Sequence, residues 1–318
     1  MPPLIKPRHE PGSALPKGAR LEHYRVRQPL NAGGFGIVYL CHDEQNDRQV
    51  VIKEYMPNKL ARRGEDGAIA PISDAHAENF AEGRKLFLQE ATALTRLHHP
   101  NIVRVLNFFS ANDTVYMVME YRPGKNLQSY IHTHSGGLSE TLLRTVFPPL
   151  LNGLRLVHDT DLLHLDIKPG NIHLCPGGVP LLLDFGAVFP RCTSRKLQVA
   201  QVVTPGFSPV EQYDPNGYVG PWTDIYAIGA TMRTCIDGSS PPPSNQRKEK
   251  DKLRPAASAF RRRYSASLLE ALDWAMEIDP LLRPQSVDEF TQALDRPDEQ
   301  EADELLERMV NPFSWFRG

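Results

Sequence analysis

The chain has 318 residues, of which 41% are hydrophobic, enough to bury the core of one large domain or two modest ones. Its 36 basic and 38 acidic side chains nearly cancel, so the net charge does not indicate a nucleic-acid partner or an anionic membrane surface. No apolar run approaches the ~18 residues of a membrane span, and no apolar signal segment begins the chain. The four cysteines lack the spacing of a metal site, so we expect reduced thiols in a cytoplasmic protein.

A proline-rich start is followed by two predicted strands and a glycine-rich turn. Residues 1–20 carry five prolines and no apolar periodicity, so we expect a flexible leader over residues 1–23. Residues 24–30 and 37–41 have the β-branched and aromatic side chains of strands, and Asn31-Ala32-Gly33-Gly34-Phe35-Gly36 lies between them. Glycines let the backbone approach a phosphate closely and present its N–H groups. Such a pattern alone is weak evidence, but a turn between two strands does not fit a dinucleotide site, which needs a following helix.

The next stretch alternates between regular elements and one polar insertion. Residues 57–82 are polar and irregular, and we expect an insertion that is functional or mobile. Lys53 closes an apolar strand, which in isolation predicts only an edge residue facing water. Glu90 lies on a predicted helix, where most glutamates are solvated. The predicted elements are strands at residues 50–53, 102–108 and 114–120 and a helix at 84–97.

After residue 126 the sequence is mainly helical. The predicted elements are helices at residues 142–158, 223–234, 268–278 and 287–294, with a polar, proline-rich loop at 239–252. A tail covers residues 296–318, and its acidic part is expected to fold back as a helix through Leu305, Leu306 and Met309. The aromatic end of the tail is also compatible with a regulatory partner or a membrane surface.

Two polar turns lie between the helices. Asp166, Lys168 and Asn171 fall within six positions, and the Pro-Gly pair between them forbids a regular helix or strand. Apolar residues flank this stretch on both sides, so we expect a tight loop anchored in a core. A second turn, Asp184-Phe185-Gly186, follows another apolar run. Two carboxylates and an amide on adjacent loops suit a metal that neutralises phosphates.

In this order, the glycine-rich turn, the strand lysine, the helix glutamate and the two polar turns resemble the eukaryotic-like (Hanks-type) serine/threonine protein kinases of bacteria. One such motif occurs by chance, but the ordered set almost never does. The resemblance covers roughly residues 24–294. It implies an α+β bilobal fold with a small β-rich N-lobe (about 24–120) and a larger α-helical C-lobe (about 124–295).

The resemblance also implies an activity and its ligands. The expected reaction transfers the γ-phosphate of ATP to Ser/Thr hydroxyls of protein substrates, and to the chain itself, with Mg²⁺ or Mn²⁺. Lys53 would reach the phosphates and pair with Glu90, while Met119 would stand behind the adenine as gatekeeper. The implied nucleotide-binding residues are Leu30, Asn31, Ala32, Gly33, Gly34, Phe35, Gly36, Ile37, Val38, Val51, Lys53, Glu90, Met119, Glu120, Arg122 and His173.

Catalytic roles follow from the same resemblance. Asp166 is the expected base for the incoming hydroxyl, and Lys168 would offset charge near the γ-phosphate, a trait of Ser/Thr rather than tyrosine kinases. Asn171 and Asp184 would ligate Mg²⁺, and Phe185 would pack inward to set the position of Asp184.

Four further residues are implied to support this machinery. Thr204, in the expected substrate-binding loop, would bond to Asp166 and Lys168. Glu211 would form a buried bidentate pair with Arg283. Asp224 would brace the backbone of the catalytic loop.

Three departures from the family pattern have expected consequences. Asn31 replaces the first glycine of the turn and puts nucleotide affinity in doubt, although Asn tolerates left-handed geometry. Leu165 stands where many regulated kinases carry an arginine that binds a loop phosphate, so we expect activity without that phosphate. His173 replaces an aliphatic floor for the adenine, either to stack there or as a tolerated substitution.

Two other functions remain as alternatives at this point. A pseudokinase, which is a kinase-shaped binding module, would usually have lost Lys53, Asp166, Asn171 or Asp184, and none is lost. A small-molecule phosphotransferase would generally lack the substrate-binding loop that ends at Glu211, the helix aspartate Asp224 and the Glu–Arg pair. The sequence therefore favours protein substrates and does not name them.

Overall fold

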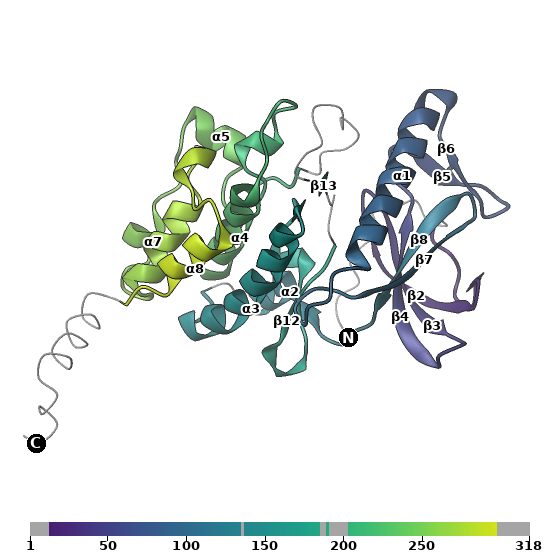
Figure 1. Cartoon of the computed structure of the whole chain (residues 1–318), viewed down its shortest axis with the longest axis horizontal. Helices are drawn as coiled ribbons and strands as arrows, with labels where there is room; N and C mark the ends of the chain where they lie inside the picture. Colours follow the sequence, from purple (N-terminus) through teal and green to yellow (C-terminus); the bar gives the residue numbers. More distant parts are fainter. Residues whose placement is uncertain (1–12, 135–136, 185–188, 191–202, 298–318) are drawn as a thin grey trace, which may run out of the picture.

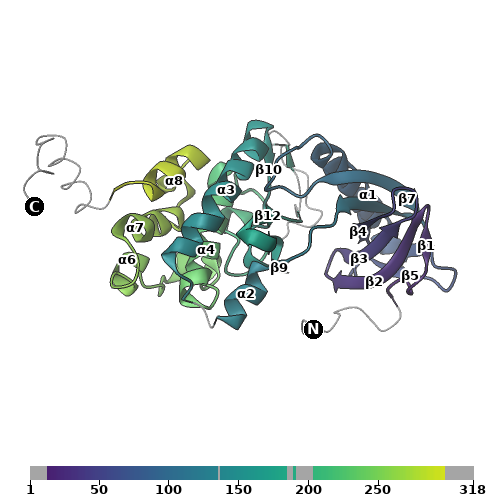
Figure 2. The ribbon, with the colours of Figure 1, turned by 90° about the horizontal axis from the view of Figure 1, so that it is seen from below.

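The computed structural model describes residues 13–134, 137–184, 189–190 and 203–297. Figure 1 shows a β-rich lobe in purple to blue beside a helical lobe in teal to yellow. The same two parts remain side by side in the perpendicular view of Figure 2. The predicted α+β bilobal fold is therefore confirmed.

An antiparallel sheet with strand order β1-β2-β3-β4-β8-β7 forms the β-rich lobe. One helix, α1, packs against β7 and β8 and buries Phe80, Phe87 and Leu94. The predicted strand at 114–120 has the bounds that the sequence indicated, because all but its last residue are buried. The elements are β1 (Arg20–Leu21), β2 (Tyr24–Ala32), β3 (Gly36–Asp43), β4 (Arg48–Tyr55), α1 (Ala77–Leu94), β7 (Val105–Ala111) and β8 (Thr114–Glu120).

Residues 57–82 differ from the irregular insertion predicted for them. They contain an antiparallel hairpin of β5 (Ala61–Arg63) and β6 (Ile69–Pro71), a short turn of 3-10 helix, η1 (Asp74–His76), and the first turns of α1. Ile69 and Ala61 are buried, so the hairpin has a small apolar contact of its own. The guanidinium of Arg63 pairs with the fully buried carboxylate of Glu54 on β4 at 2.5 Å. A hairpin this short has too little periodicity to be recognised in the sequence.

The leader also differs from its prediction where the structure describes it. β1 joins the sheet by pairing with β2. The N–H of Leu15 donates to the hydroxyl of Tyr39 at 3.1 Å, and Arg63 donates to the carbonyl of Ser13 at 2.9 Å. Residues 13–21 are thus bound to the β-rich lobe, while residues 1–12 lie outside the described residues.

The helical lobe is built around α4, in which nearly every residue is buried. Four helices begin with an Asn or Ser side chain that accepts a backbone N–H three residues further on, namely Asn126, Ser139, Ser265 and Ser286. The predicted loop at 239–252 contains a helix, α5, which its prolines and charges had hidden. The helices are α2 (Leu127–Thr133), α3 (Glu140–Asp159), α4 (Pro221–Asp237), α5 (Ser244–Glu249), α6 (Ala256–Ala259), α7 (Ala266–Ala275) and α8 (Val287–Leu294).

The remaining elements of the described residues are short strands and 3-10 turns. The strands are β9 (Lys125–Asn126), β10 (Leu162–Leu163), β11 (Ile172–Leu174), β12 (Pro180–Leu182) and β13 (Phe189–Pro190), and the 3-10 turns are η2 (Pro169–Asn171), η3 (Pro176–Gly178), η4 (Val210–Gln212) and η5 (Pro280–Leu282). In the parts of the chain that the structure describes, no helix combines the length and apolarity needed to span a membrane. The predicted tail helix lies outside the described residues from residue 298 onward.

Candidate active site

The glycine-rich turn joins β2 to β3 at the edge of the site. Gly36 must be glycine because a Cβ there would lie 1.8 Å from the carbonyl oxygen of Glu54 on β4. A Cβ on Gly34 would meet open space, so this part of the turn leaves its backbone accessible. Asn31 stays in β2 opposite Val38 and does not have a positive φ. The left-handed geometry considered for Asn31 is therefore not needed.

Lys53 projects from β4 toward the second polar turn. Its ammonium lies 3.2 Å from Oδ1 of Asp184 and 5.8 Å from the ring centre of Phe87 on α1. Burial alone would raise the pKa of Asp184, but the Lys53 ammonium lowers it below the ordinary value, so the carboxylate is ionised. The structure brings these two distant residues together, as the predicted site requires.

The predicted ion pair between Lys53 and Glu90 is not formed. Glu90 is buried on α1, and within the described residues Lys53 makes its ion pair with Asp184 alone. Burial raises the pKa of the Glu90 carboxyl to about 7, against a smaller lowering by the Lys53 ammonium.

Three residues predicted to surround an adenine lie on the strands β4, β8 and β11. Val51 on β4 lies opposite Met119 on β8, and Met119 is buried. His173 on β11 places Nε2 3.1 Å from the carbonyl oxygen of Arg122. Burial lowers the pKa of His173, so the neutral ring can donate this hydrogen bond. His173 therefore has a defined partner in the connecting segment, which the sequence alone did not indicate.

The first polar turn gathers donors around the carboxylate of Asp166. Lys168 Nζ lies 2.8 and 2.7 Å from its two oxygens, and the hydroxyl of Thr204 donates to Oδ1 at 2.7 Å. Asn171 Nδ2 donates to Oδ2 at 2.9 Å, and Lys168 also donates to the Thr204 hydroxyl at 3.1 Å. The predicted contacts of Thr204 with Asp166 and Lys168 are confirmed. The Asp166 carboxylate and the Lys168 ammonium therefore lie next to each other, and Thr204 contacts both.

A metal would find a suitable donor set between the two turns. The amide nitrogen of Asn171 is used on Asp166, donating to its carbonyl and its carboxylate, so Oδ1 of Asn171 is left as an acceptor. Asp184 supplies an ionised carboxylate. Its backbone has a φ of 46°, which is uncommon for a residue other than glycine. Hard oxygen donors of this kind fit Mg²⁺ or Mn²⁺.

Asp224 on α4 holds the backbone of the catalytic loop in place. Its Oδ2 accepts the N–H of His164 at 2.9 Å, and its Oδ1 accepts the N–H of Leu165 at 2.8 Å. Leu165 has a φ of 60°, a strained geometry for a branched side chain. The predicted brace is confirmed, and its two hydrogen bonds explain how the strained turn persists.

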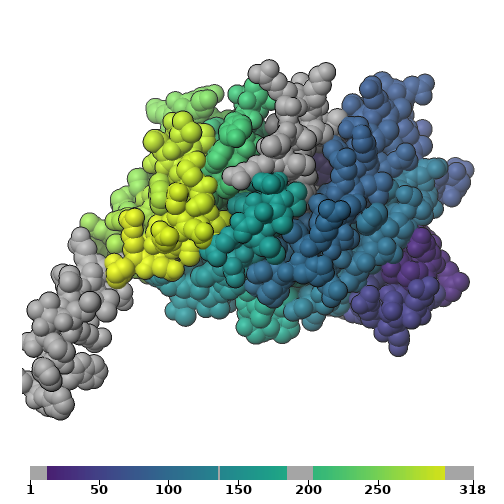
Figure 3. All heavy atoms as spheres, in the orientation of Figure 1, coloured from purple at the N-terminus to yellow at the C-terminus, as the bar shows by residue number. Residues whose placement is uncertain are grey.

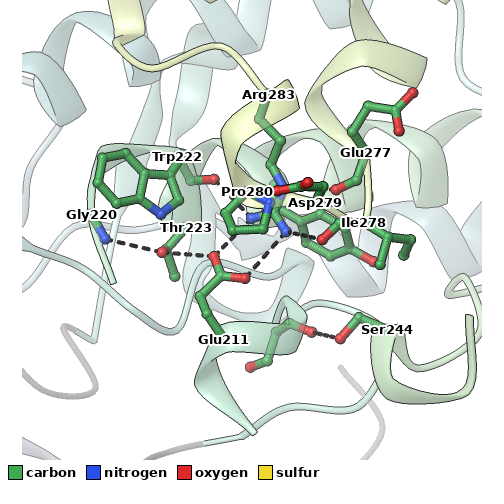
Figure 4. Close-up of polar contacts among 12 residues, drawn as sticks. Glu211, Gly220, Trp222, Thr223, Ser244, Glu277, Ile278, Asp279, Pro280 and Arg283 are labelled. Atoms are coloured by element: carbon green, nitrogen blue, oxygen red, sulfur yellow. Dashed lines mark hydrogen bonds and ion pairs between the residues drawn. The ribbon is translucent and has the colours of Figure 1, made fainter. Parts of the chain in front are cut away.

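Glu211 and Arg283 form the predicted bidentate pair (Figure 4). Arg283 donates to the two carboxylate oxygens at 2.7 and 3.2 Å, and both side chains are almost fully buried. Thr223 donates to Glu211 at 2.9 Å, and Arg283 donates further to the carbonyls of Glu277 and Ile278. The pair fixes the end of the predicted substrate-binding loop against α4 and the turn after α7.

Sequence reasoning missed three residues that support the site. His158 on α3 places Nε2 2.8 Å from Asp224, and Gln212 donates to the carbonyl of Leu165 at 2.9 Å. Ser244 on α5 donates to the carbonyl of Ser208 at 2.7 Å. No local pattern distinguishes these side chains, because each acts on a partner more than thirty positions away. The predictions for Phe185 and Gly186 fall outside the described residues.

Comparisons with known proteins agree with the geometry of the site. Residues 24–312 match the family model described as "Protein kinase domain". The chain is 28% identical to "Serine/threonine-protein kinase D" of Synechocystis sp. over 286 residues, which cover 86% of this chain and 52% of that protein. It is 29% identical to "Serine/threonine-protein kinase pkn2" of Myxococcus xanthus over 286 residues, covering 85% of this chain and 32% of the relative. The chain thus spans about half or less of the length of these relatives.

A solved structure gives a further match. The structure titled "PpkA-294 apo form" superposes with a TM-score of 0.78 and 36% sequence identity. The match covers 89% of this chain and 100% of that one.

Proposed function

Since the chain belongs to the protein kinase family, we propose that it is an ATP-dependent serine/threonine protein kinase that also phosphorylates itself. The observation that carries this proposal is that five residues from four parts of the chain form two polar groups. Asp166 is bonded to Lys168 and Thr204, and Lys53 is paired with Asp184. Protein substrates are favoured because the loop from Thr204 to Glu211 is held in a defined position.

Each residue has a role in phosphoryl transfer that its contacts support. Asp166 would accept the proton of the incoming Ser or Thr hydroxyl, and Lys168 would offset the negative charge that develops on the transferred group. Thr204 orients both through its hydroxyl. Lys53 would contact the nucleotide phosphates, and the glycine-rich turn would offer its backbone N–H groups to them.

Asn171 and Asp184 would hold Mg²⁺ or Mn²⁺, which when bound neutralises phosphate charge. In the structure, Asp184 pairs with Lys53. We propose that Lys53 moves away from Asp184, toward the phosphates and toward Glu90, when Asp184 binds the metal. Adenine would lie between Val51 and His173, against the backbone of Glu120 and Arg122. Leu30, Ala32, Ile37 and Val38 would complete the nucleotide site from β2 and β3.

A reducing compartment, the cytoplasm, is the proposed location. The support is that Cys41, Cys175 and Cys235 are free and buried, as expected for thiols that are not used in disulfides. ATP and protein substrates are the proposed partners, and a regulatory partner that binds the tail, residues 296–318, is a further proposal.

Transfer from radiolabelled ATP to myelin basic protein tests the proposal. Wild-type protein should label the substrate and itself, and Asp166→Asn should reduce both by about a thousandfold, since it removes the proton acceptor with little change in shape. Glu78→Gln, an exposed change on α1, is the control and should leave the rate unchanged. Equal labelling by wild type and Asp166→Asn, or ATP binding with no transfer by the wild type, would overturn it.

A further inference from the structure

The helical lobe has a basic edge made of three consecutive arginines between α6 and α7. Arg261, Arg262 and Arg263 all have exposed side chains. Arg263 is held in place, because it donates to the carbonyl of Gly137 at 3.1 Å and lies 5.5 Å from the ring centre of Tyr264. Within the described residues, neither Arg261 nor Arg262 has an ion-pair partner. We call residues 261–263 the arginine edge.

Nearby carboxylates are already engaged elsewhere. Glu140 accepts hydrogen bonds from Arg144 and from both the N–H and the hydroxyl of Ser265. Asp273 accepts the backbone N–H groups of Ala256 and Ala257 at the start of α6. Among the described residues, neither carboxylate forms an ion pair with the arginine edge.

Arg144 connects this edge to the end of α8. Its guanidinium donates to the carbonyl of Leu294, the last residue of α8, at 3.0 Å, and to the hydroxyl of Ser265 at 3.1 Å. Ser265 follows Arg263 by two positions. The chain therefore leaves α8, yellow in Figure 3, close to the arginine edge and at the far side of the helical lobe from the β-rich lobe.

The segment that follows α8 has the opposite charge. Residues 298–307 contain six acidic side chains and no basic one: Asp298, Glu299, Glu301, Asp303, Glu304 and Glu307. Asp298 lies four positions after Leu294, which an extended chain spans with at most ~14 Å. The first carboxylates of this segment are thus tethered within reach of the arginine edge.

We propose that residues 298–307 dock on the arginine edge of the same molecule. Opposite charges attract the two segments, and guanidinium groups can bind carboxylates through two parallel hydrogen bonds. The tether gives the segment a high effective concentration that a separate acidic peptide or a second copy does not have. Arg263 is already ordered by its contacts with Gly137 and Tyr264, so less side-chain entropy is lost on docking. The tail thereby covers a positive surface that would otherwise attract acidic partners.

Hydrogen exchange of the full chain, followed by mass spectrometry, tests this inference. Backbone exchange of residues 298–307 should be about threefold slower at about 20 mM salt than at about 0.5 M salt, where exposed charges are screened. Charge reversal on one side, Arg261→Glu with Arg262→Glu, or Glu301→Lys with Glu304→Lys, should remove the protection. The combined four-residue swap should restore it, because the attraction is then re-formed with the signs exchanged.

Controls separate this effect from a loss of folding and from other occupants. Lys248→Glu with Lys250→Glu makes the same charge change on exposed residues in and just after α5, away from the end of α8 in Figure 1, and should leave the protection intact. Exchange of the buried helix α4 should be equal in all variants, which reports an intact lobe. The proposal is overturned by one-sided variants that exchange like wild type or by a combined swap without recovery. Protection that disappears on tenfold dilution would assign the arginine edge to a second copy instead.

Discussion

The ammonium of Lys53 lies 3.2 Å from Asp184, while Glu90, buried nearby on α1, has no ion-pair partner among the residues that the structure describes. Lys53 is thus held by the residue proposed to bind the metal and not by its expected partner on the helix. Burial raises the pKa of Glu90 to about 7, so this carboxyl is easily protonated. The free-energy cost of burying Glu90 therefore depends on whether its carboxyl is protonated. The stability of the protein should consequently vary with pH.

We expect Glu90→Gln to stabilise the protein more at high pH than at low pH. The folded-state pKa of about 7 is above the ordinary glutamate value of 4.5, so between these two values the folded state keeps a proton that the unfolded state has released. Stability then falls as the pH rises through this window, by up to about 3 kcal/mol at ~1.36 kcal/mol per unit. The neutral amide in Glu90→Gln removes this pH-dependent loss of stability. The difference in melting temperature between Glu90→Gln and wild type should grow from pH 5 to pH 8.

The exposed Glu78 on the same helix provides the matched control. Glu78→Gln should change the melting temperature equally at both pH values. A Glu90→Gln effect that does not vary with pH would contradict the argument from burial.

Arg283→Met should destabilise the protein by about 3–5 kcal/mol, because it leaves the carboxylate of Glu211 buried and without its cation. Urea denaturation followed by far-UV circular dichroism measures the change. In Arg283→Met with Glu211→Gln, much of the loss should be recovered. Arg25→Met is the control: it breaks a pair with Glu44 at 2.6 Å in which both side chains are partly exposed, and should cost at most about 1 kcal/mol. Equal losses for the two arginines would refute the role of burial.

Arg63→Met should destabilise the β5–β6 hairpin and weaken the attachment of residues 13–21 to the β-rich lobe. Arg63 pairs with Glu54, which also accepts the hydroxyls of Tyr39 and Tyr116 at 2.8 and 2.6 Å. Without the cation, a fully buried charge remains, and we expect a loss of about 3 kcal/mol and faster hydrogen exchange over residues 13–21. Arg62→Met, an exposed neighbour on the same strand, should change neither quantity. Unchanged exchange over residues 13–21 in Arg63→Met would show that the leader is held independently.

Thr204→Val should lower kcat by about tenfold or more with little change in the KM for ATP, because it removes the hydroxyl that joins Asp166 to Lys168. Thr204→Ser keeps that hydroxyl and should retain most of the activity. Steady-state phosphorylation of myelin basic protein measures both constants. A valine variant as active as the serine variant would exclude an orienting role for Thr204.

Activity should not require a phosphate on the loop between the second polar turn and Glu211. Leu165, where a phosphate-binding arginine would stand, is buried and apolar. Thr193→Ala with Ser194→Ala should therefore keep turnover within about twofold of wild type, a change of less than ~0.5 kcal/mol. Ser208 belongs in a separate variant, because its hydroxyl accepts the N–H of Thr204 at 3.0 Å and has a structural role. A collapse of turnover in the double variant to the Asp166→Asn level would contradict this prediction.

Much of the site could be predicted because short sequence patterns bring their own local geometry. Pro169 and Gly170 favour a tight turn that places Asp166, Lys168 and Asn171 close together, and Asp224 then holds the backbone of that loop. The strand at 114–120 and the helix at 287–294 were predicted with their bounds, because continuous burial and helical periodicity are strong signals over such lengths.

By itself the sequence determined the fold class, the order of the motifs and the turn that gathers the proposed catalytic groups. Only the tertiary structure decided which partner Lys53 takes, that His158 and Gln212 support the loop, and that Arg63 anchors the hairpin and the leader on Glu54. The physical reason is that ion pairs and hydrogen bonds between distant residues depend on burial and on the protonation that burial imposes. Neither burial nor protonation can be predicted from the local sequence, because both depend on how the whole chain packs.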